Sequence, residues 1–474
     1  KAKDALIMWR TLSELSPYLN IMSTSKEVNT GLVLKALMAT AEMKSAGAVP
    51  SEIAEILNTG SLKSDKLLSN KLEDISKIMS LYKTLHDEKY SDVGDDLETL
   101  AGVLEEHPDF FGDSAFFVEG FTSFTEPQYK LLGILMKNTD VNILLPISKR
   151  CRDFFEYTEI RDTEERILSL ADKGGVKKSL VRPDSRDESQ NPVISEVGDL
   201  LWQRFGKADG ENVESFKDAI RIFEAEDPYE EADFICQDIN RRVMAGERYR
   251  DFAVVMRDGE MYGGIIDEAF SNSGIPYFMS KSKELFTFEE IKLIYAAYAV
   301  IGSDFAREDV ISYIKCGFTG LSREACDEFE LYVEKWQING KRFTDGILWN
   351  MNPDGFSSRV SEDMGEKLLS INASREKITE PLLRFKAALS AAKTVKEHAR
   401  VLTEFLCDIN LYEQIEKRRA ELTALGENEK ADERGEIWRV IVESLDTIAE
   451  ALDDSEADRE SFASRLRVVH SFMK

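Results

Sequence analysis

The apolar positions near the start of the chain recur with the period of an amphipathic helix. One stripe repeats at alternating steps of four and three residues and consists of Leu68, Leu72, Ile75, Met79 and Tyr82. Such a stripe gives a helix one apolar face, which is more often part of a core than of a cofactor pocket. Pro50, followed by a serine and an apolar run, is expected to start another helix. Residues 1–112 are therefore predicted to form a helical subdomain.

The period changes at Ala115, where short apolar runs begin. Ala115–Val118 and Val141–Leu145 are typical of buried parallel strands. Glu126 and Pro127 are expected to open a helix between them. The order strand, helix, strand predicts a βαβ unit and hence an α/β layer.

A second α/β stretch is predicted after residues 173–192, which lack periodicity and are expected to be a loop. Ile220–Phe223 and Phe252–Met256 are the expected strands, and Gly274–Met279 is an expected extended segment. Asp227 can cap a helix whose first turn holds a proline and an acidic residue, so a helix is expected to start there. From about residue 306 the chain is predicted to be almost wholly helical, with loops near residues 317–320, 352–358 and 426.

Composition and charge narrow the class of protein. The 474 residues exceed what one core usually holds and predict roughly two to four domains. The net charge of −27 argues against a generally basic surface that coats nucleic acid, although a local basic groove is compatible with it. No apolar run approaches the roughly 18 residues of a membrane span. Five cysteines without a C-x-x-C pair favour a reducing cytoplasm and argue against a zinc or iron–sulfur site built from them.

The most informative candidate for chemistry follows the first predicted strand. In a motor NTPase, an apolar strand ends in two acidic residues, of which one holds Mg²⁺ and the other activates the attacking water. Here Glu119 could reach a metal, but Gly120 occupies the second position and offers no base. The alternative is that Glu119 and Gly120 simply form a turn at the end of a strand.

Arg257 is a second candidate, because it stands at the carboxyl end of a predicted strand. Ligands of open α/β sheets bind at that edge, and an arginine there can clamp a nucleotide phosphate. A solvated surface residue is the commoner explanation. The chain has no G-x-x-x-x-G-K-[ST] loop, H-E-x-x-H or G-x-S-x-G motif, so no catalytic residue is predicted. The paired acids at 95–96 and 453–454 are interpreted as parts of solvated faces.

Taken together, these segments resemble superfamily 1 helicases, and most closely the AddB subunits of bacterial AddAB-type helicase–nucleases. The resemblance covers nearly the whole chain. It rests on three blocks: Val118–Phe121 with Phe124-Thr125; Asp251–Arg257 with Tyr262, Gly274–Tyr277, Phe286 and Glu290–Lys292; and Tyr332-Val333 with Ile338–Phe343.

The resemblance implies an α/β fold with large all-α insertions. Two partial RecA-like parallel-sheet lobes would cover 113–212 and 213–305, with a helical 1B-like subdomain at 1–112 and a helical 2B-like subdomain at 306–474. Glu119, Gln128 and Arg257 would face the nucleotide cleft. The chain departs from the family's ATPase motifs at two places. Glu119 stands where the family usually has Asp, and Pro146–Lys149 stands where a motor helicase has the residues that couple ATP to DNA movement.

The same resemblance predicts a role in DNA repair. The chain begins without Met and is expected to be an internal piece, because the phosphate-binding loop and the nuclease domain with its iron–sulfur cluster would lie outside it. It would be the non-motor centre of a B subunit that joins an AddA-type subunit, processes double-strand breaks and scans single-stranded DNA for Chi. ATP, Mg²⁺ and the cluster would belong to the longer protein, and no metal site is expected here.

Two other functions are compatible with the residues. The first is a helical scaffold with a decayed nucleotide fold that binds protein rather than DNA, which the charge of −27 favours slightly. The second is an active ATPase whose phosphate loop lies outside the chain, against which Gly120 argues. The motifs do not identify the DNA contacts; a groove of Lys and Arg with aromatic stacking platforms is the physical expectation.

Overall fold

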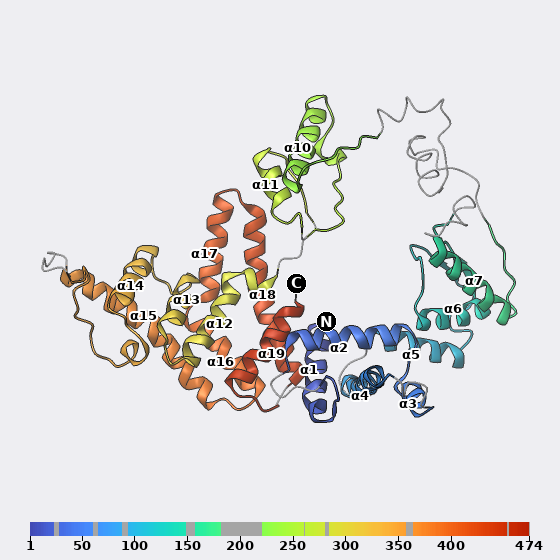
Figure 1. Cartoon of the computed structure of the whole chain (residues 1–474), viewed down its shortest axis with the longest axis horizontal. Coiled ribbons are helices and arrows are strands. Elements are labelled where there is room, and N and C mark those ends of the chain that lie inside the picture. The colour runs from blue at the N-terminus through green and yellow to red at the C-terminus, as the bar shows by residue number, and fades with distance from the viewer. Residues whose placement is uncertain are drawn as a thin grey trace. The chain divides into compact units, whose positions relative to one another are not determined.

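The computed structural model describes residues 1–22, 28–59, 65–87, 93–147, 157–181, 220–259, 261–279, 284–356, 364–452 and 455–473 (Figure 1). Over these residues the chain is mostly helical. The α-helices are α1 (Ala2–Leu15), α2 (Thr30–Ser45), α3 (Pro50–Thr59), α4 (Lys66–Asp87), α5 (Val93–Glu106), α6 (Glu126–Asn138), α7 (Thr158–Lys173), α10 (Pro228–Met244), α11 (Ile265–Asn272), α12 (Glu289–Gly302), α13 (Arg307–Lys315), α14 (Arg323–Lys335), α15 (Met364–Ala391), α16 (Val395–Asp408), α17 (Leu411–Ala424), α18 (Asn428–Leu452) and α19 (Arg459–Phe472).

Short 3₁₀ helices and two strands complete the described structure. The 3₁₀ helices are η1 (Ser16–Tyr18), η3 (Tyr249–Asp251), η4 (Leu285–Thr287) and η5 (Gly340–Phe343). The strands are β1 (Ala115–Val118) and β2 (Asp140–Ile143). Among the described residues, no helix combines the length and apolarity that crossing a bilayer requires.

The chain divides into two compact units. Unit 1 consists of Lys1–Asp96 and Ser282–Lys474, and unit 2 of Leu97–Lys281. The two ends of the chain meet in unit 1, where α1 packs against α18 and α19 (Figure 1). The four domains predicted from the sequence, at 1–112, 113–212, 213–305 and 306–474, remain predictions. The two units are defined by contacts between residues, and unit 1 combines two separate stretches of the chain.

The core of unit 1 is built from the helices α12 to α19. It buries aromatic side chains almost completely, among them Phe305, Tyr313, Phe318, Phe329, Tyr332, Phe343 and Phe462. One acidic side chain is also fully buried there: Glu290 accepts two hydrogen bonds of 2.6 Å from the Arg434 guanidinium of α18. A buried carboxylate needs an ion pair or several hydrogen bonds to offset its lost hydration, and this ion pair ties α12 to α18.

The first helices of unit 1 are joined by a buried carboxylate. Asp74 of α4 accepts hydrogen bonds from the backbone N–H groups of Asn20, Ile21 and Met22, at 2.8, 2.7 and 3.0 Å. Burial alone would raise the pKa of Asp74, but these hydrogen bonds outweigh it and hold the pKa below its usual value. Asp74 therefore fixes the turn after η1 against α4.

Unit 2 contains the predicted βαβ unit. β1 pairs with β2 in parallel, from Ala115 opposite Asp140 to Val118 opposite Ile143. Between the strands, α6 begins at Glu126 as the sequence predicted, and it packs with α7 around Leu132, Met136 and Ala171. The prediction of an α/β element at this place is confirmed.

The rest of unit 2 is a small helical core. The start of α10 is confirmed: Asp227 Oδ1 accepts hydrogen bonds of 2.9 Å from the backbone N–H groups of Tyr229 and Glu230. α10 and α11 pack around Ala232, Cys236, Ile239, Ile266, Phe270 and Ile275.

The predictions of strands at Ile220–Phe223 and Phe252–Met256 were wrong. Neither segment forms a ladder with another described segment, and the described sheet has two strands only. Ile222 is 95% exposed and Val255 is 92% exposed. An apolar run becomes a strand only when a neighbour offers its backbone hydrogen bonds, and alternation along one segment does not supply that neighbour.

Candidate functional site

The candidate site begins where β1 ends. The strand pair closes with a 2.8 Å hydrogen bond from the backbone N–H of Leu144 to the carbonyl of Val118. Glu119 and Gly120 follow immediately, and both are exposed. This is the carboxyl edge of a parallel pair, where ligands of α/β folds bind.

Gly120 has a backbone conformation that explains its identity. Its φ is +81°, in the left-handed region that disfavours residues with a Cβ. A Cβ added there would meet no atom within 4 Å, so the constraint is the backbone and not the available space. The position that would hold a second acidic residue in a motor therefore holds a turn.

Phe121 begins a cluster of aromatic side chains beside this turn. Its ring stacks on that of Phe124 at 4.9 Å, and Phe124 meets the buried Tyr129 edge-on at 5.6 Å. The Arg166 guanidinium of α7 lies 3.9 Å from the Tyr129 ring and pairs with Glu126. The hydrogen bond to Glu126 raises the pKa of Arg166.

Sequence reasoning missed this cluster. The spacing Phe-x-x-Phe before a helix start was its only signal, and nothing in the sequence pointed to Arg166. The cluster packs α6 and α7 under the turn that carries Glu119. It therefore supports the site without adding a reactive group to it.

The Gln128 side chain has a structural partner. Its Oε1 accepts a 2.8 Å hydrogen bond from the backbone N–H of Thr125, which closes the first turn of α6. A nucleotide-facing role for Gln128 remains a prediction, and this contact accounts for the residue without it.

Arg257 follows the extended segment Phe252–Met256, and its side chain is exposed. Two hydrogen bonds organise the chain nearby: Tyr262 Oη donates to Glu231 at 2.5 Å, and Tyr277 Oη donates to Asp267 at 2.9 Å. Among the described residues, no hydrogen bond or ion pair joins Arg257 to Glu119. The two predicted nucleotide-facing charges are each present at the end of an extended run, but no contact links them.

A cavity of about 710 Å³ lies beside β2 rather than at Glu119. Its walls come from β2, from the facing sides of α6 and α7, and from residues 176–181. Apolar side chains such as Val141, Ile143 and Ile167 line it, and Lys177 and Lys178 contribute to its wall. Since Glu119 and Gln128 are not among its lining residues, the cavity and the predicted nucleotide-facing residues are separate features of unit 2.

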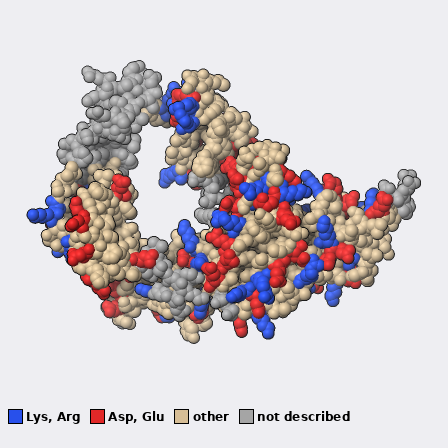
Figure 2. Space-filling view, turned by 180° about the vertical axis from the view of Figure 1, so that it is seen from behind, with Lys and Arg blue, Asp and Glu red and all other residues tan. Residues whose placement is uncertain are grey.

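The surface charge is mixed. Figure 2 shows Lys and Arg interspersed with Asp and Glu over the face that it presents. Because the net charge is −27, an anionic ligand must be bound by a local group of cations.

Comparison with known families decides the relationship of the chain. The family described as "UvrD-like helicase C-terminal domain" matches residues 191–474, and the family described as "ADDB, N-terminal" matches residues 2–195. The chain belongs to the UvrD-like helicase family.

Within that family, the chain is similar to AddB proteins, as the sequence motifs predicted. Three relatives carry the name of the B subunit of an ATP-dependent helicase/deoxyribonuclease. The identity is 27% for the relative from Caldanaerobacter subterraneus subsp. tengcongensis, 26% for that from Acetivibrio thermocellus and 28% for that from Clostridium kluyveri. Each alignment covers 98% of this chain and 40%, 41% and 41% of the relatives, respectively. The chain thus spans about two fifths of the length of the curated relatives that it matches.

The metal groups that the resemblance implied for the longer protein remain predictions. Among the described residues, no three His, Cys, Asp or Glu side chains lie close enough to hold a metal ion. The described cysteines Cys236, Cys316, Cys326 and Cys407 are free thiols, and burial raises the pKa of Cys316 to about 11. Cys151 lies outside the described residues.

Proposed function

We propose that the chain is the central, non-motor part of the B subunit of an ATP-dependent helicase–exonuclease that processes DNA double-strand breaks for recombinational repair. In this role it contributes single-stranded DNA binding, Chi scanning and assembly with an AddA-type subunit. The observation that carries the proposal is the turn at Gly120, placed where a motor of the same family needs a catalytic base.

The position of Gly120 is subject to two opposing demands. A motor needs a carboxylate next to the metal-binding acid so that a water can be activated. The turn after β1 has φ = +81°, which glycine adopts more readily than any residue with a Cβ. In this chain the position is occupied by glycine, so Glu119 has no acidic neighbour at the end of the strand. The βαβ unit therefore serves as a scaffold.

The remaining parts of the proposal follow from the family. Glu119 and Arg257 would line the remnant of a nucleotide cleft, within two partial RecA-like lobes. ATP, Mg²⁺ and an iron–sulfur cluster would be held by other parts of the longer protein. The partners would be an AddA-type helicase–nuclease subunit and both single- and double-stranded DNA, in the cytoplasm.

Two measurements on the whole chain test the proposal. ATP hydrolysis should equal the buffer blank with and without oligodeoxythymidylate, because the chain has neither the second acidic residue nor a phosphate-binding loop. Binding of a labelled single strand should weaken steeply as salt rises, because phosphate contacts release counterions. Measurable ATP turnover, or equal retention of a neutral polymer and of DNA at all salt concentrations, would count against the proposal.

A second candidate function is a helical scaffold that binds protein and not DNA. The net charge of −27 favours it slightly, since an acidic surface opposes the binding of a polyanion. The discriminating result is a chain that retains an AddA-type subunit while it binds no single-stranded DNA at low salt.

A further inference from the structure

The loop between α14 and α15 carries cations without acidic partners. They are Lys335 at the end of α14, and Lys341 and Arg342 in η5. All three are exposed, and none forms an ion pair with another described residue. Three cations without an ion pair thus lie within eight residues of a chain whose net charge is −27.

The contacts of these cations are with neutral atoms. Lys335 Nζ donates to the carbonyl of Pro353 at 2.7 Å. The Arg342 guanidinium donates to the carbonyl of Trp336 at 3.4 Å and approaches the sulfur of Met351 at 3.6 Å. Neutral hydrogen-bond partners position a cation without neutralising its charge.

The nearest acidic side chains are already occupied. Glu334 pairs with Arg307 at 3.5 Å, and Asp354 pairs with Lys367 at 3.3 Å. Asp304 pairs with Lys386 at 2.5 Å. Asp345 pairs with Arg375 at 3.0 Å. Lys341 and Arg342 lie near Asp304 and Asp345 and help to lower the pKa of these carboxyls, but both acids take their ion pairs from other cations, so positive charge remains in excess.

An aromatic pair lies on the same surface. The Phe356 side chain is 89% exposed, and its ring centroid is 4.9 Å from that of Trp336. Trp336 is held by a 3.0 Å hydrogen bond from its Nε1 to the carbonyl of Asn352. Since Trp336 contacts Arg342 through its carbonyl and Phe356 through its ring, the cations and the aromatic pair form one continuous surface.

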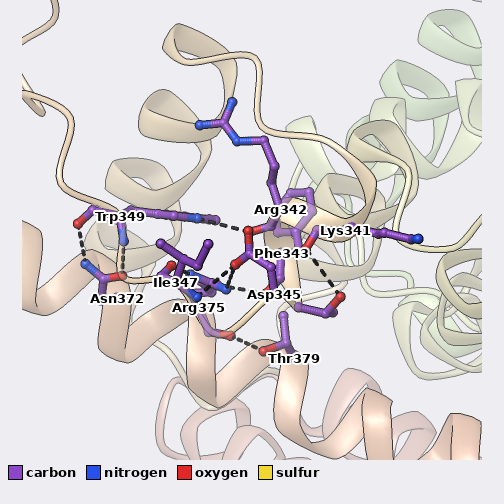
Figure 3. A network of polar contacts seen from close by, with 10 residues as sticks. Lys341, Arg342, Phe343, Asp345, Ile347, Trp349, Asn372, Arg375 and Thr379 are labelled. Carbon is purple, nitrogen blue, oxygen red and sulfur yellow. Dashed lines mark hydrogen bonds and ion pairs between the residues drawn. The ribbon is translucent and has the colours of Figure 1, made fainter.

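We call this surface the α14–α15 loop surface: Lys335, Trp336, Lys341, Arg342 and Phe356. A buried arginine holds the loop beneath it. Arg375 of α15 donates to the carbonyls of Phe343 and Ile347, at 2.7 and 2.5 Å, and to Asp345 at 3.0 Å (Figure 3).

The same network fixes the backbone of η5. The Arg375 guanidinium lies 4.9 Å from the Trp349 ring, and Trp349 Nε1 donates to the carbonyl of Arg342 at 3.1 Å. At the other end, the backbone N–H of Gly340 donates to the carbonyl of Phe305 at 2.9 Å. In Figure 3 the Lys341 and Arg342 side chains point away from this network. The loop thus presents both cations from a rigid backbone.

We propose that the α14–α15 loop surface binds single-stranded DNA. The proposal rests on the proposed function and supplies the contact residues that the motifs could not identify. Cations bind phosphates, and an exposed aromatic face stacks an unpaired base. A preorganised loop loses little conformational entropy on binding. Because the net charge of −27 opposes the approach of a polyanion, binding depends on this local excess of positive charge.

Fluorescence anisotropy of the full chain with a labelled 20-residue oligodeoxythymidylate tests the proposal. Lys341→Glu with Arg342→Glu should weaken binding about tenfold or more at low salt, since two phosphate contacts are lost. It should also make the slope of log affinity against log salt shallower by about 1.4. Phe356→Ala should weaken binding about tenfold with the slope unchanged, because stacking releases no counterions.

The matched control is Lys396→Glu with Arg400→Glu on α16. Both side chains are exposed, and the double variant changes the net charge by the same amount. It should bind like the unmodified chain, and circular-dichroism melting should show that all variants are folded. Equal weakening in the control would overturn the proposal by showing a general charge effect.

The other outcomes separate this proposal from the proposed function. If the unmodified chain binds no single strand, the DNA-binding function itself fails. If it binds and both loop variants bind equally well, the function stands and the loop assignment fails. Displacement of the oligonucleotide by polyglutamate at equal charge concentration would assign the surface to an acidic protein. Equal affinity for a duplex, with no effect of Phe356→Ala, would also overturn the single-strand assignment.

Discussion

The turn after β1 and the loop before α15 differ in how the chain holds them. Gly120 turns in open space, and the neighbouring Glu119 is exposed. The loop around η5 also contains a left-handed glycine, Gly340, but it is anchored by the buried Arg375. The turn after β1 is thus shaped by its own backbone, whereas the loop before α15 is fixed by hydrogen bonds to a buried side chain. A loop that the sequence motifs did not single out therefore has more fixing contacts than the turn that they did.

The largest expected effect comes from removing the anchor of the loop. Arg375→Ala leaves the carbonyls of Phe343 and Ile347 without their donor and opens space beside Trp349. We expect unit 1 to lose about 3 kcal/mol of stability, measured by urea unfolding of the full chain. Arg375→Lys, which keeps the charge but not the planar fork, should lose less. An Arg375→Ala variant as stable as the unmodified chain would mean that the network does not hold the loop.

The stability of unit 1 should also depend on pH through a buried histidine. His470 lies between the Tyr295 hydroxyl at 2.8 Å and the Ser444 hydroxyl at 3.0 Å, and burial lowers its pKa to about 3. Below about pH 6.5 the unfolded chain binds a proton that the folded chain does not, so stability falls as the pH falls from 6.5 toward 3.

Between pH 7 and pH 5 this amounts to about 2 kcal/mol. Denaturant titrations at the two pH values measure it. His470→Gln should be less stable at pH 7 but should flatten the pH dependence in this window. A variant with an unchanged pH profile would show that other groups cause the effect.

The turn after β1 should be less sensitive. Gly120→Ala places a Cβ at φ = +81° and should cost unit 2 about 1 kcal/mol, seen as faster hydrogen exchange in β1 and β2. Gly120→Asp restores the acidic pair. It should still give no ATP turnover, because the chain has no phosphate-binding loop. ATP hydrolysis by the Gly120→Asp variant would show that the turn after β1 belongs to a working nucleotide site, which would contradict the proposed non-motor role.

The smallest effect is expected at Glu119. Its carboxylate is exposed and forms no ion pair with another described residue, so Glu119→Gln should leave the melting temperature unchanged. Differential scanning fluorimetry of Glu119→Gln measures this, with Gly120→Ala as the variant that is expected to be less stable. A clear loss of stability at Glu119 would reveal a structural role that the contacts do not show.

Features that depend on a few neighbouring residues were predictable from the sequence. The cap at Asp227, the helix starting at Pro50 and the order β1, α6, β2 all follow from preferences that act within one or two turns of chain. The family could be recognised because short motifs such as Val118–Phe121 keep their residues in order. The hydrogen bond from the Thr125 backbone N–H to Gln128 spans only three residues, so it too could have been predicted from the sequence.

Only the tertiary structure decided which segments became partners. It packed α1 on α19 from opposite ends of the chain, left Phe252–Met256 without a strand neighbour, and placed Arg375 under a loop about thirty residues earlier. The physical reason is that an apolar run or an arginine specifies what it needs, such as burial or hydrogen-bond acceptors, but not which distant segment will supply it. That choice is made by the packing of the whole chain.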